Sequence, residues 1–210
     1  MKRMVRFSRK QKTDAVRNQP FWIKMMKIFL LISFVAGIFA ANLMGREAVS
    51  NAGVLNDYFI EKFRYAQVDG QNLFFYIAGE RLPLLILLFV LFFTSFGVFG
   101  GILVLGWQGF SVGFMLSTGI AKYGIKGIVL VLGGLFPQYF FYLAVYVCYC
   151  YAAVLLRQRL SKEGRGVRER KLAYGMGGIS FAVLLLVFAA GIFLESYVNP
   201  MVLKYILKIF

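Results

Sequence analysis

Long apolar runs separated by short polar segments make up most of this chain of 210 residues. The runs predict membrane-spanning helices at about 28–44, 82–105, 108–123, 126–156 and 173–194. A helix of about 20 apolar residues crosses the hydrocarbon core of a bilayer, which is about 30 Å thick. We therefore predict an all-α fold: a polytopic integral membrane bundle of five transmembrane helices, forming a single membrane domain over residues 28–210.

The longest uncharged stretch contains the second and third of these spans. It runs from Leu82 to Ala121, and its 40 residues would form a straight helix about 60 Å long, about twice the hydrocarbon core. We expect it to turn back at residues 106–109, where Gly106 and Gly109 permit unusual backbone angles and Trp107 suits the membrane interface. The third span, 108–123, is then short for a full crossing.

Proline affects the last two spans. Pro137 lacks an amide hydrogen and crowds the carbonyl four residues back, so we expect a kink in the fourth span, with Gln138 or a neighbouring helix bonding to the freed backbone. The fifth span should end at Asn199 and Pro200, because the residue before a proline disfavours helix. Residues 195–210 then form an outer tail.

The polar segment 45–80, between the first two spans, has an amphipathic pattern. Apolar residues recur at intervals of three or four at Ala48, Ala52, Leu55, Phe59 and Phe63. We predict an amphipathic extracytoplasmic helix that lies on the membrane or on its own bundle, or else docks a partner. Leu55, Phe59 and Phe63 are the candidate docking residues.

Composition agrees with a membrane location. The chain is 60% hydrophobic, 18% aromatic and 16% charged, whereas soluble domains are about 45–50% apolar and about 25% charged. The net charge of +15 would suggest nucleic acid in a soluble protein, but no recognition motif accompanies it. The basic residues gather in two blocks, 1–27 and 157–172, each beside an apolar run. We interpret them as a positive-inside signal with some attraction to lipid head groups, and expect no nucleic acid partner.

The two basic blocks also constrain the topology. If both are cytoplasmic, an even number of crossings separates them; spans one to four supply it, and the fifth places the C-terminus outside. A re-entrant hairpin at 107–136 would put the block 157–172 outside, against the charge rule. We expect the first span to be an anchor rather than a cleaved signal peptide, because Ile38 and Phe39 are too bulky for a cleavage site.

No constellation of catalytic residues is present in the sequence. The chain contains no histidine, which removes imidazole bases and imidazole metal ligands. Cys148 and Cys150 point in different directions on a helix, which indicates neither a disulfide nor a metal clip. A lysine-activated serine would need a lysine inside the bundle, whereas Lys122 and Lys126 lie at a predicted interface. We therefore predict a non-enzymatic protein with no cofactor and no metal.

Small residues recur at helix-packing intervals in the pairs Gly37 and Ala41, Gly97 and Gly101, and Gly109 and Gly113. Such pairs let helices approach closely in lipid. We expect packing within the bundle, with a homo-oligomer face as the alternative.

Few polar side chains are expected deep in the membrane. Gln138 and Asn42 would form hydrogen bonds between helices or, alternatively, line a narrow solute path. Glu195, near the outer surface, would pair with Arg81 or another helix end, or else belong to a docking site.

Three motifs resemble a known family. They are Trp107-Gln108-Gly109-Phe110-Ser111-Val112-Gly113-Phe114, Gly127-Ile128 leading to Leu135-Phe136-Pro137-Gln138, and Glu195-Ser196-Tyr197-Val198-Asn199-Pro200. Their order and the five-span layout resemble stage II sporulation protein M, in its clostridial form, over most of the chain. Many members carry Pro-His-Gly and a following glutamate in span four, and this chain departs from them with Pro137-Gln138-Tyr139.

The resemblance implies a role in sporulation: a scaffold in the cell membrane of endospore-forming bacteria that localises sporulation proteins D and P, two hydrolases that remodel peptidoglycan during engulfment. The expected partners are these hydrolases and membrane lipids. The candidate docking or packing residues are, besides those of segment 45–80, Gly109, Gly113, Pro137, Gln138, Glu195, Tyr197, Asn199 and Pro200. The alternative is a permease or channel-like transport subunit, suggested by the short third span, the kinked fourth span and the many glycines.

Overall fold

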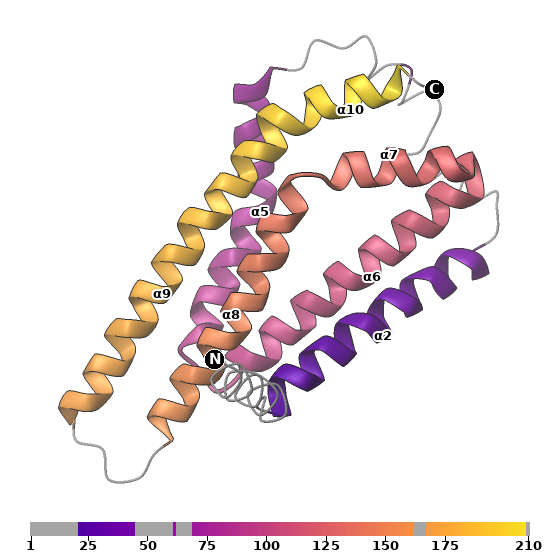
Figure 1. Ribbon diagram of the computed structural model, residues 1–210. Coiled ribbons are helices and arrows are strands. Elements are labelled where there is room, and N and C mark those ends of the chain that lie inside the picture. Colours follow the sequence, from indigo (N-terminus) through magenta and orange to yellow (C-terminus); the bar gives the residue numbers. More distant parts are fainter. Residues whose placement is uncertain (1–20, 45–60, 62–68, 162–166, 209–210) are drawn as a thin grey trace, which may run out of the picture.

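The computed structural model describes residues 21–44, 61, 69–161 and 167–208, and the regular structure of this part is entirely helical (Figure 1). In chain order its elements are α2 (Phe21–Leu43), α5 (Gly70–Phe92), α6 (Gly97–Tyr123), α7 (Ile125–Leu135), α8 (Gln138–Leu160), α9 (Val167–Phe193), the π-helical turn η2 (Leu194–Val198) and α10 (Asn199–Leu207).

Five helices are long and apolar enough to cross a membrane. They are α2, α5, α6, α8 and the continuous helical run that starts with α9. The predicted all-α membrane bundle of five spans is therefore confirmed.

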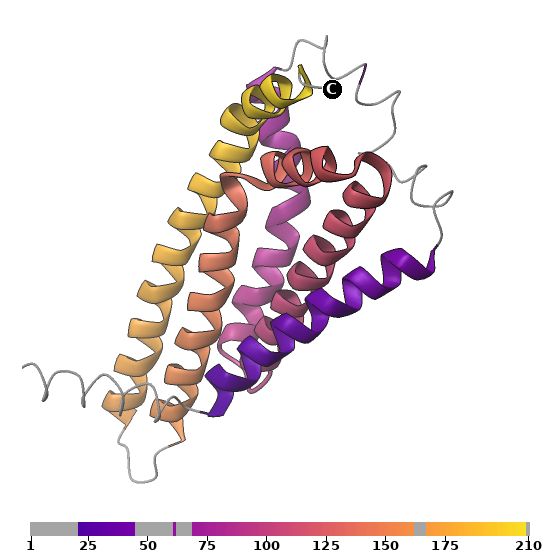
Figure 2. The same cartoon turned by 45° about the vertical axis from the view of Figure 1, so that its right-hand side comes forward.

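The long helices run between two ends of the bundle (Figures 1 and 2). What we call the lower end holds the start of α2, the α5–α6 connection, the end of α8 and the start of α9. The upper end holds α7, α10 and the start of α5. Four long helices separate the start of α2 from the end of α8, so the even number of crossings expected between the two basic blocks is present.

The uncharged stretch turns back earlier than the sequence predicted. The turn is at residues 93–96, where the Thr94 hydroxyl donates to the Leu91 carbonyl and accepts from the Phe96 amide. Helix α5 ends before this turn and begins at Gly70, with Asp69 as its N-cap. The predicted spans 82–105 and 108–123 were therefore wrong in their bounds. A long α5 contains Arg81 because that charge is paired inside the protein, as described below.

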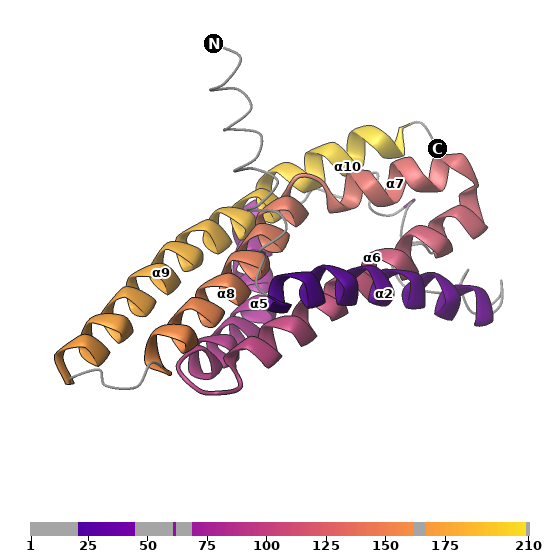
Figure 3. The ribbon, with the colours of Figure 1, turned by 60° about the horizontal axis from the view of Figure 1, so that its bottom comes forward.

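The predicted turn glycines instead lie inside α6, which is a full-length helix of 27 residues. A Cβ on Gly109 would lie 2.8 Å from the Leu30 carbonyl oxygen, and one on Gly113 would collide with that of Phe34. These glycines let α2 and α6 touch along their backbones (Figure 3). The predicted packing of Gly109 and Gly113 within the bundle is confirmed. The predicted short third span is wrong, because α6 is a full-length helix.

The predicted kink at Pro137 is a complete break between two helices. Helix α7 ends at Leu135, Phe136 is extended, and α8 begins at Gln138. This agrees with the rule that the residue before a proline avoids helical geometry. With 11 residues, α7 is about 16 Å long and too short to cross a bilayer, so 126–156 is not one span.

The chain also does not stop at Asn199 and Pro200 as predicted. It continues as α10, with Pro200 in the first turn, where a missing amide hydrogen breaks no helical bond. Leu207 is buried, and it packs with Leu130 and Val131 of α7. The expected outer tail is thus a second short helix across the upper end.

The other bounds differ because charged residues are included in helix ends. Helix α2 begins at Phe21 rather than 28, and α8 and α9 reach into the basic block 157–172. Long basic side chains can extend from a helix end to the interface, so they do not end a helix. Of the predicted amphipathic segment 45–80, residues 70–80 belong to α5, whereas Leu55, Phe59 and Phe63 lie outside the described residues.

Candidate functional site

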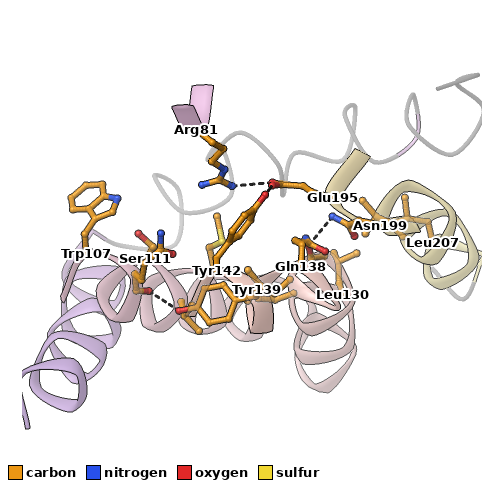
Figure 4. Close-up of a pocket in the computed structure, with 17 residues that line it drawn as sticks. Arg81, Trp107, Ser111, Leu130, Gln138, Tyr139, Tyr142, Glu195, Asn199 and Leu207 are labelled. Atoms are coloured by element: carbon orange, nitrogen blue, oxygen red, sulfur yellow. Dashed lines mark hydrogen bonds and ion pairs between the residues drawn. The ribbon is translucent and has the colours of Figure 1, made fainter. Parts of the chain in front are cut away.

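A cavity of about 410 Å³ lies at the upper end of the bundle (Figure 4). Its lining comes from six segments: Arg81 of α5, residues 107–115 of α6, 130–135 of α7, 138–142 of α8, Glu195 of η2 and 199–207 of α10. The site therefore exists only when segments spread from residue 81 to residue 207 have packed together.

An ion pair forms one wall of the cavity. Arg81 Nη2 donates to Glu195 Oε1 at 2.9 Å, and the Tyr142 hydroxyl donates to Glu195 Oε2 at 2.5 Å. The guanidinium also lies over the Tyr142 ring, 5.1 Å from its centroid. A charge in the membrane is costly unless it is paired. The predicted pairing of Glu195 with Arg81 is confirmed.

The π-helical turn η2 carries Glu195 into the site. The Ser196 hydroxyl, fully buried, donates to the Ile192 carbonyl at 2.6 Å. Single turns of π-helix inside α-helices are frequent at functional sites, because the extra residue changes which side chains face a neighbour. Here Glu195 and Asn199 both line the cavity.

Two amide side chains meet at the break before Pro137. Gln138 Nε2 and Asn199 Nδ2 both donate to the Gly134 carbonyl, at 2.6 and 2.9 Å. This carbonyl belongs to the last turn of α7, where helix carbonyls lack an intrahelical partner. Gln138 thus bonds to the backbone freed near Pro137, as expected, but to the carbonyl of Gly134 and not to the one four residues before the proline. Asn199 bonds to the same Gly134 carbonyl from a distant part of the sequence.

The opposite wall is formed by α6. The Tyr139 hydroxyl donates to the Gln108 carbonyl at 3.3 Å and links α8 to α6. Trp107 and Met115 also line the cavity, and their side chains are 67% and 41% exposed. The cavity therefore opens on the side of α6.

The structure brings together three of the candidates selected from the sequence: Gln138, Glu195 and Asn199. Tyr197 lies outside the cavity, stacked on Phe193 with ring centroids 4.7 Å apart. The remaining candidates within the described residues are structural: Gly109 and Gly113 face α2, and Pro137 and Pro200 start helices. Leu55, Phe59 and Phe63 lie outside the described residues.

The site is also lined by Ser111, Tyr139 and Tyr142, which were not among the residues predicted from the sequence. A signal for Tyr142 was available in the sequence. Residues 138, 142, 146 and 149 follow one another at intervals of three or four and all carry polar tips, which indicates one polar-tipped face of a helix.

The chemistry of this site is hydrogen bonding. Glu195 is the one carboxylate among the lining side chains, and it is already bonded to Arg81 and Tyr142. No group of three or more metal-ligating side chains occurs in the part of the chain that the structure describes. The arrangement suits recognition of a polar group rather than proton transfer.

A family model described as stage II sporulation protein M matches residues 26–200. The match covers Arg81, Gln138, Glu195 and Asn199, and thus all the polar walls of the cavity. No curated protein and no solved structure matches the chain.

Proposed function

Because this chain belongs to the stage II sporulation protein M family and is a sporulation-related membrane protein, we propose that it is a non-enzymatic scaffold. In this proposal it holds sporulation proteins D and P, the peptidoglycan hydrolases of engulfment, at the membrane that migrates around the forespore.

The scaffold requires the upper end to face the cell wall. Basic residues at the lower end support this orientation: Lys24 and Lys27 lie near the start of α2, and Arg157 and Arg159 lie in the last turn of α8. By the positive-inside rule the lower end is cytoplasmic. The N-terminus is then cytoplasmic in the bacterial cell, and α7, α10 and the C-terminus are outside, where the hydrolases work.

The observation that carries the proposal is an outward-facing stripe on η2 and α10. Tyr197, Met201 and Tyr205 follow at intervals of four and are 36%, 72% and 72% exposed; we call them the outer stripe. The inner face of α10 is fixed to α7 through Leu207, which is 1% exposed. A short helix held on one side, with large apolar and aromatic side chains on the other, suits docking of a partner.

We also propose segment 45–80 as part of this docking surface, because its last residues, 70–80, begin α5 at the upper end (Figure 1). Leu55, Phe59 and Phe63 supply its apolar face in the sequence, although they lie outside the described residues.

Substitutions in the outer stripe test the scaffold. We expect the double variant Met201→Ser and Tyr205→Ser to lose at least about tenfold in co-purification with sporulation proteins D and P from sporulating cells, because the apolar contact area is removed. Membrane insertion should be unchanged, since both side chains point away from the bundle.

The matched control is on α7, at the same end of the bundle. Ile125 and Leu132 are 82% and 51% exposed, and the double variant Ile125→Ser and Leu132→Ser should retain both hydrolases. Undiminished co-purification by the outer-stripe variant, or equal loss in both variants, would contradict docking at the outer stripe.

A transport subunit is the second candidate, and the polar cavity beside Gln138 favours it. Transport needs a polar path that continues through the bundle. Below the cavity, however, the core consists of large side chains that are at most 2% exposed, including Tyr146, Tyr149, Phe92 and Phe188. The scaffold is the better supported of the two functions.

A further inference from the structure

Two buried acceptor atoms of the cavity have no hydrogen-bond partner among the described residues. They are Gln138 Oε1 and Asn199 Oδ1. Gln138 as a whole is only 5% exposed. Burying a carbonyl oxygen without a hydrogen bond is costly, so each such atom calls for a donor.

The orientation of both amides is fixed by the backbone. An amide nitrogen cannot be exchanged for its oxygen here, because the Gly134 carbonyl accepts from both Gln138 Nε2 and Asn199 Nδ2. If either amide were flipped, its side-chain oxygen would face the Gly134 carbonyl oxygen, and both groups are acceptors. The two side-chain oxygens therefore point away from Gly134 and need a donor from elsewhere.

No side-chain donor that lines the cavity bonds to either of these two oxygens, and the two lining tyrosines donate elsewhere. Tyr142 donates to Glu195 and Tyr139 donates to the Gln108 carbonyl. The charge of Arg81 is balanced by Glu195. The site therefore suits a ligand that supplies N–H or O–H donors to the two oxygens. Because Arg81 and Glu195 balance each other, the site has no net charge that would favour an anion.

The mouth of the cavity indicates where the ligand comes from. Its exposed lining residues, Trp107 and Met115, belong to α6, one of the five helices that are long and apolar enough to cross a membrane. A bilayer would cover this side of the bundle. Other parts of the lining are apolar, such as Leu130, Leu203 and Leu207, and can contact hydrocarbon.

We propose that the cavity binds one phospholipid whose head group carries N–H or O–H donors, such as the ammonium of phosphatidylethanolamine. The head donates to Gln138 Oε1 and Asn199 Oδ1. Arg81, which has five N–H donors and uses Nη2 for Glu195, lies beside the phosphate. The cavity volume of about 410 Å³ is within the range of about 300–1,000 Å³ typical of small-molecule sites.

Two lipids of equal net charge test the proposal. Phosphatidylcholine carries a trimethylammonium group without hydrogen-bond donors, whereas phosphatidylethanolamine carries three N–H donors. The full chain, purified from an equimolar mixture of the two with identical acyl chains, should retain phosphatidylethanolamine at least about fivefold over phosphatidylcholine by native mass spectrometry, the factor that one net hydrogen bond supplies. Equal retention means that the cavity holds water only, and it overturns the proposal without using any variant.

Variants then locate the site. Gln138→Met and Asn199→Leu each remove one acceptor, while the other amide still bonds to Gly134, so the fold is preserved and the lipid ratio should fall toward one. Asn42→Leu is the control, because the Asn42 amide bonds to Ile38 and Ser117 outside the cavity. An unchanged ratio in both cavity variants, or an equal fall in the control, would place the lipid elsewhere and refute the assignment.

A final arm separates lipid from a soluble compound. Free phosphoethanolamine, added to the delipidated protein, should raise the unfolding temperature far less than phosphatidylethanolamine does, because it cannot use the apolar lining. Equal stabilisation by both would refute a lipid site. These measurements do not involve the hydrolases, so their outcome is independent of the scaffold proposal.

Discussion

Arg81 and Glu195 form a link between helices that are far apart in the sequence. Their side chains are 36% and 17% exposed, and Tyr142 contacts both of them. A paired charge of this kind adds little stability by comparison with a well-packed apolar pair, but a single unpaired charge left behind is costly. The pair therefore matters more for the position of α5 against η2 than for the total stability.

This asymmetry gives a prediction at the scale of single residues. Glu195→Gln and Arg81→Met should each lower the free energy of unfolding by about 1–3 kcal/mol, which is less than the roughly 3–5 kcal/mol for a fully buried pair because Arg81 is partly exposed. The double variant Arg81→Met and Glu195→Leu should be less destabilised than the sum of the single changes. Thermal unfolding in detergent measures all three, and strictly additive losses would show that the two residues do not interact.

At the scale of elements, the glycines of α6 and α9 differ in what surrounds them. Gly109 and Gly113 are needed where α6 touches α2, whereas added Cβ atoms on Gly175 and Gly178 of α9 would meet nothing within 4 Å. Gly109 and Gly113 are therefore required by a neighbouring helix, whereas no neighbouring helix requires glycine at positions 175 and 178. From the sequence alone, each glycine is equally compatible with a turn, a close contact or an open surface.

The helix contact gives a prediction with an internal control. Gly113→Ala should weaken the α2–α6 contact and lower the unfolding temperature by several degrees, because its methyl group would collide with the Phe34 carbonyl. Gly178→Ala should be neutral, or stabilising by up to about 1 kcal/mol, since alanine is the better helix former. Equal effects of the two changes on the unfolding temperature would argue against a backbone contact at Gly113.

At the scale of the whole molecule, the two ends of the bundle differ in construction. The lower end consists of a tight turn and the basic ends of long helices, whereas the upper end is covered by two short helices, α7 and α10, that enclose the polar cavity (Figure 2). Both proposals, the outer stripe and the lipid site, concern the upper end.

The orientation of the ends can be measured directly. In a background of Cys148→Ala and Cys150→Ala, a Lys208→Cys variant should react with a membrane-impermeant maleimide in intact cells. Ser161→Cys, at the lower end, should react only after permeabilisation, because we place that end in the cytoplasm. The reverse labelling pattern would exclude docking of wall hydrolases at α10.

The sequence by itself determined the number of crossings, the helical class and the shared end of the two basic blocks. These depend on transfer of each segment from water to lipid, which is set by local composition. It also identified Gln138 and Glu195 as candidates, because polar residues beside long apolar runs are rare and costly, whereas Asn199 was selected through the motif that it shares with Glu195.

Only the tertiary structure decided where the chain turns and what those residues do. The turn at residues 93–96 has no glycine, and Gly106 and Gly109 are helical because α2 packs on them. The cavity joins Arg81, Gln138 and Asn199 from three separate segments, and Gly134 accepts from the last two. Contacts of this kind depend on which helix faces lie together, and local hydropathy does not encode that choice.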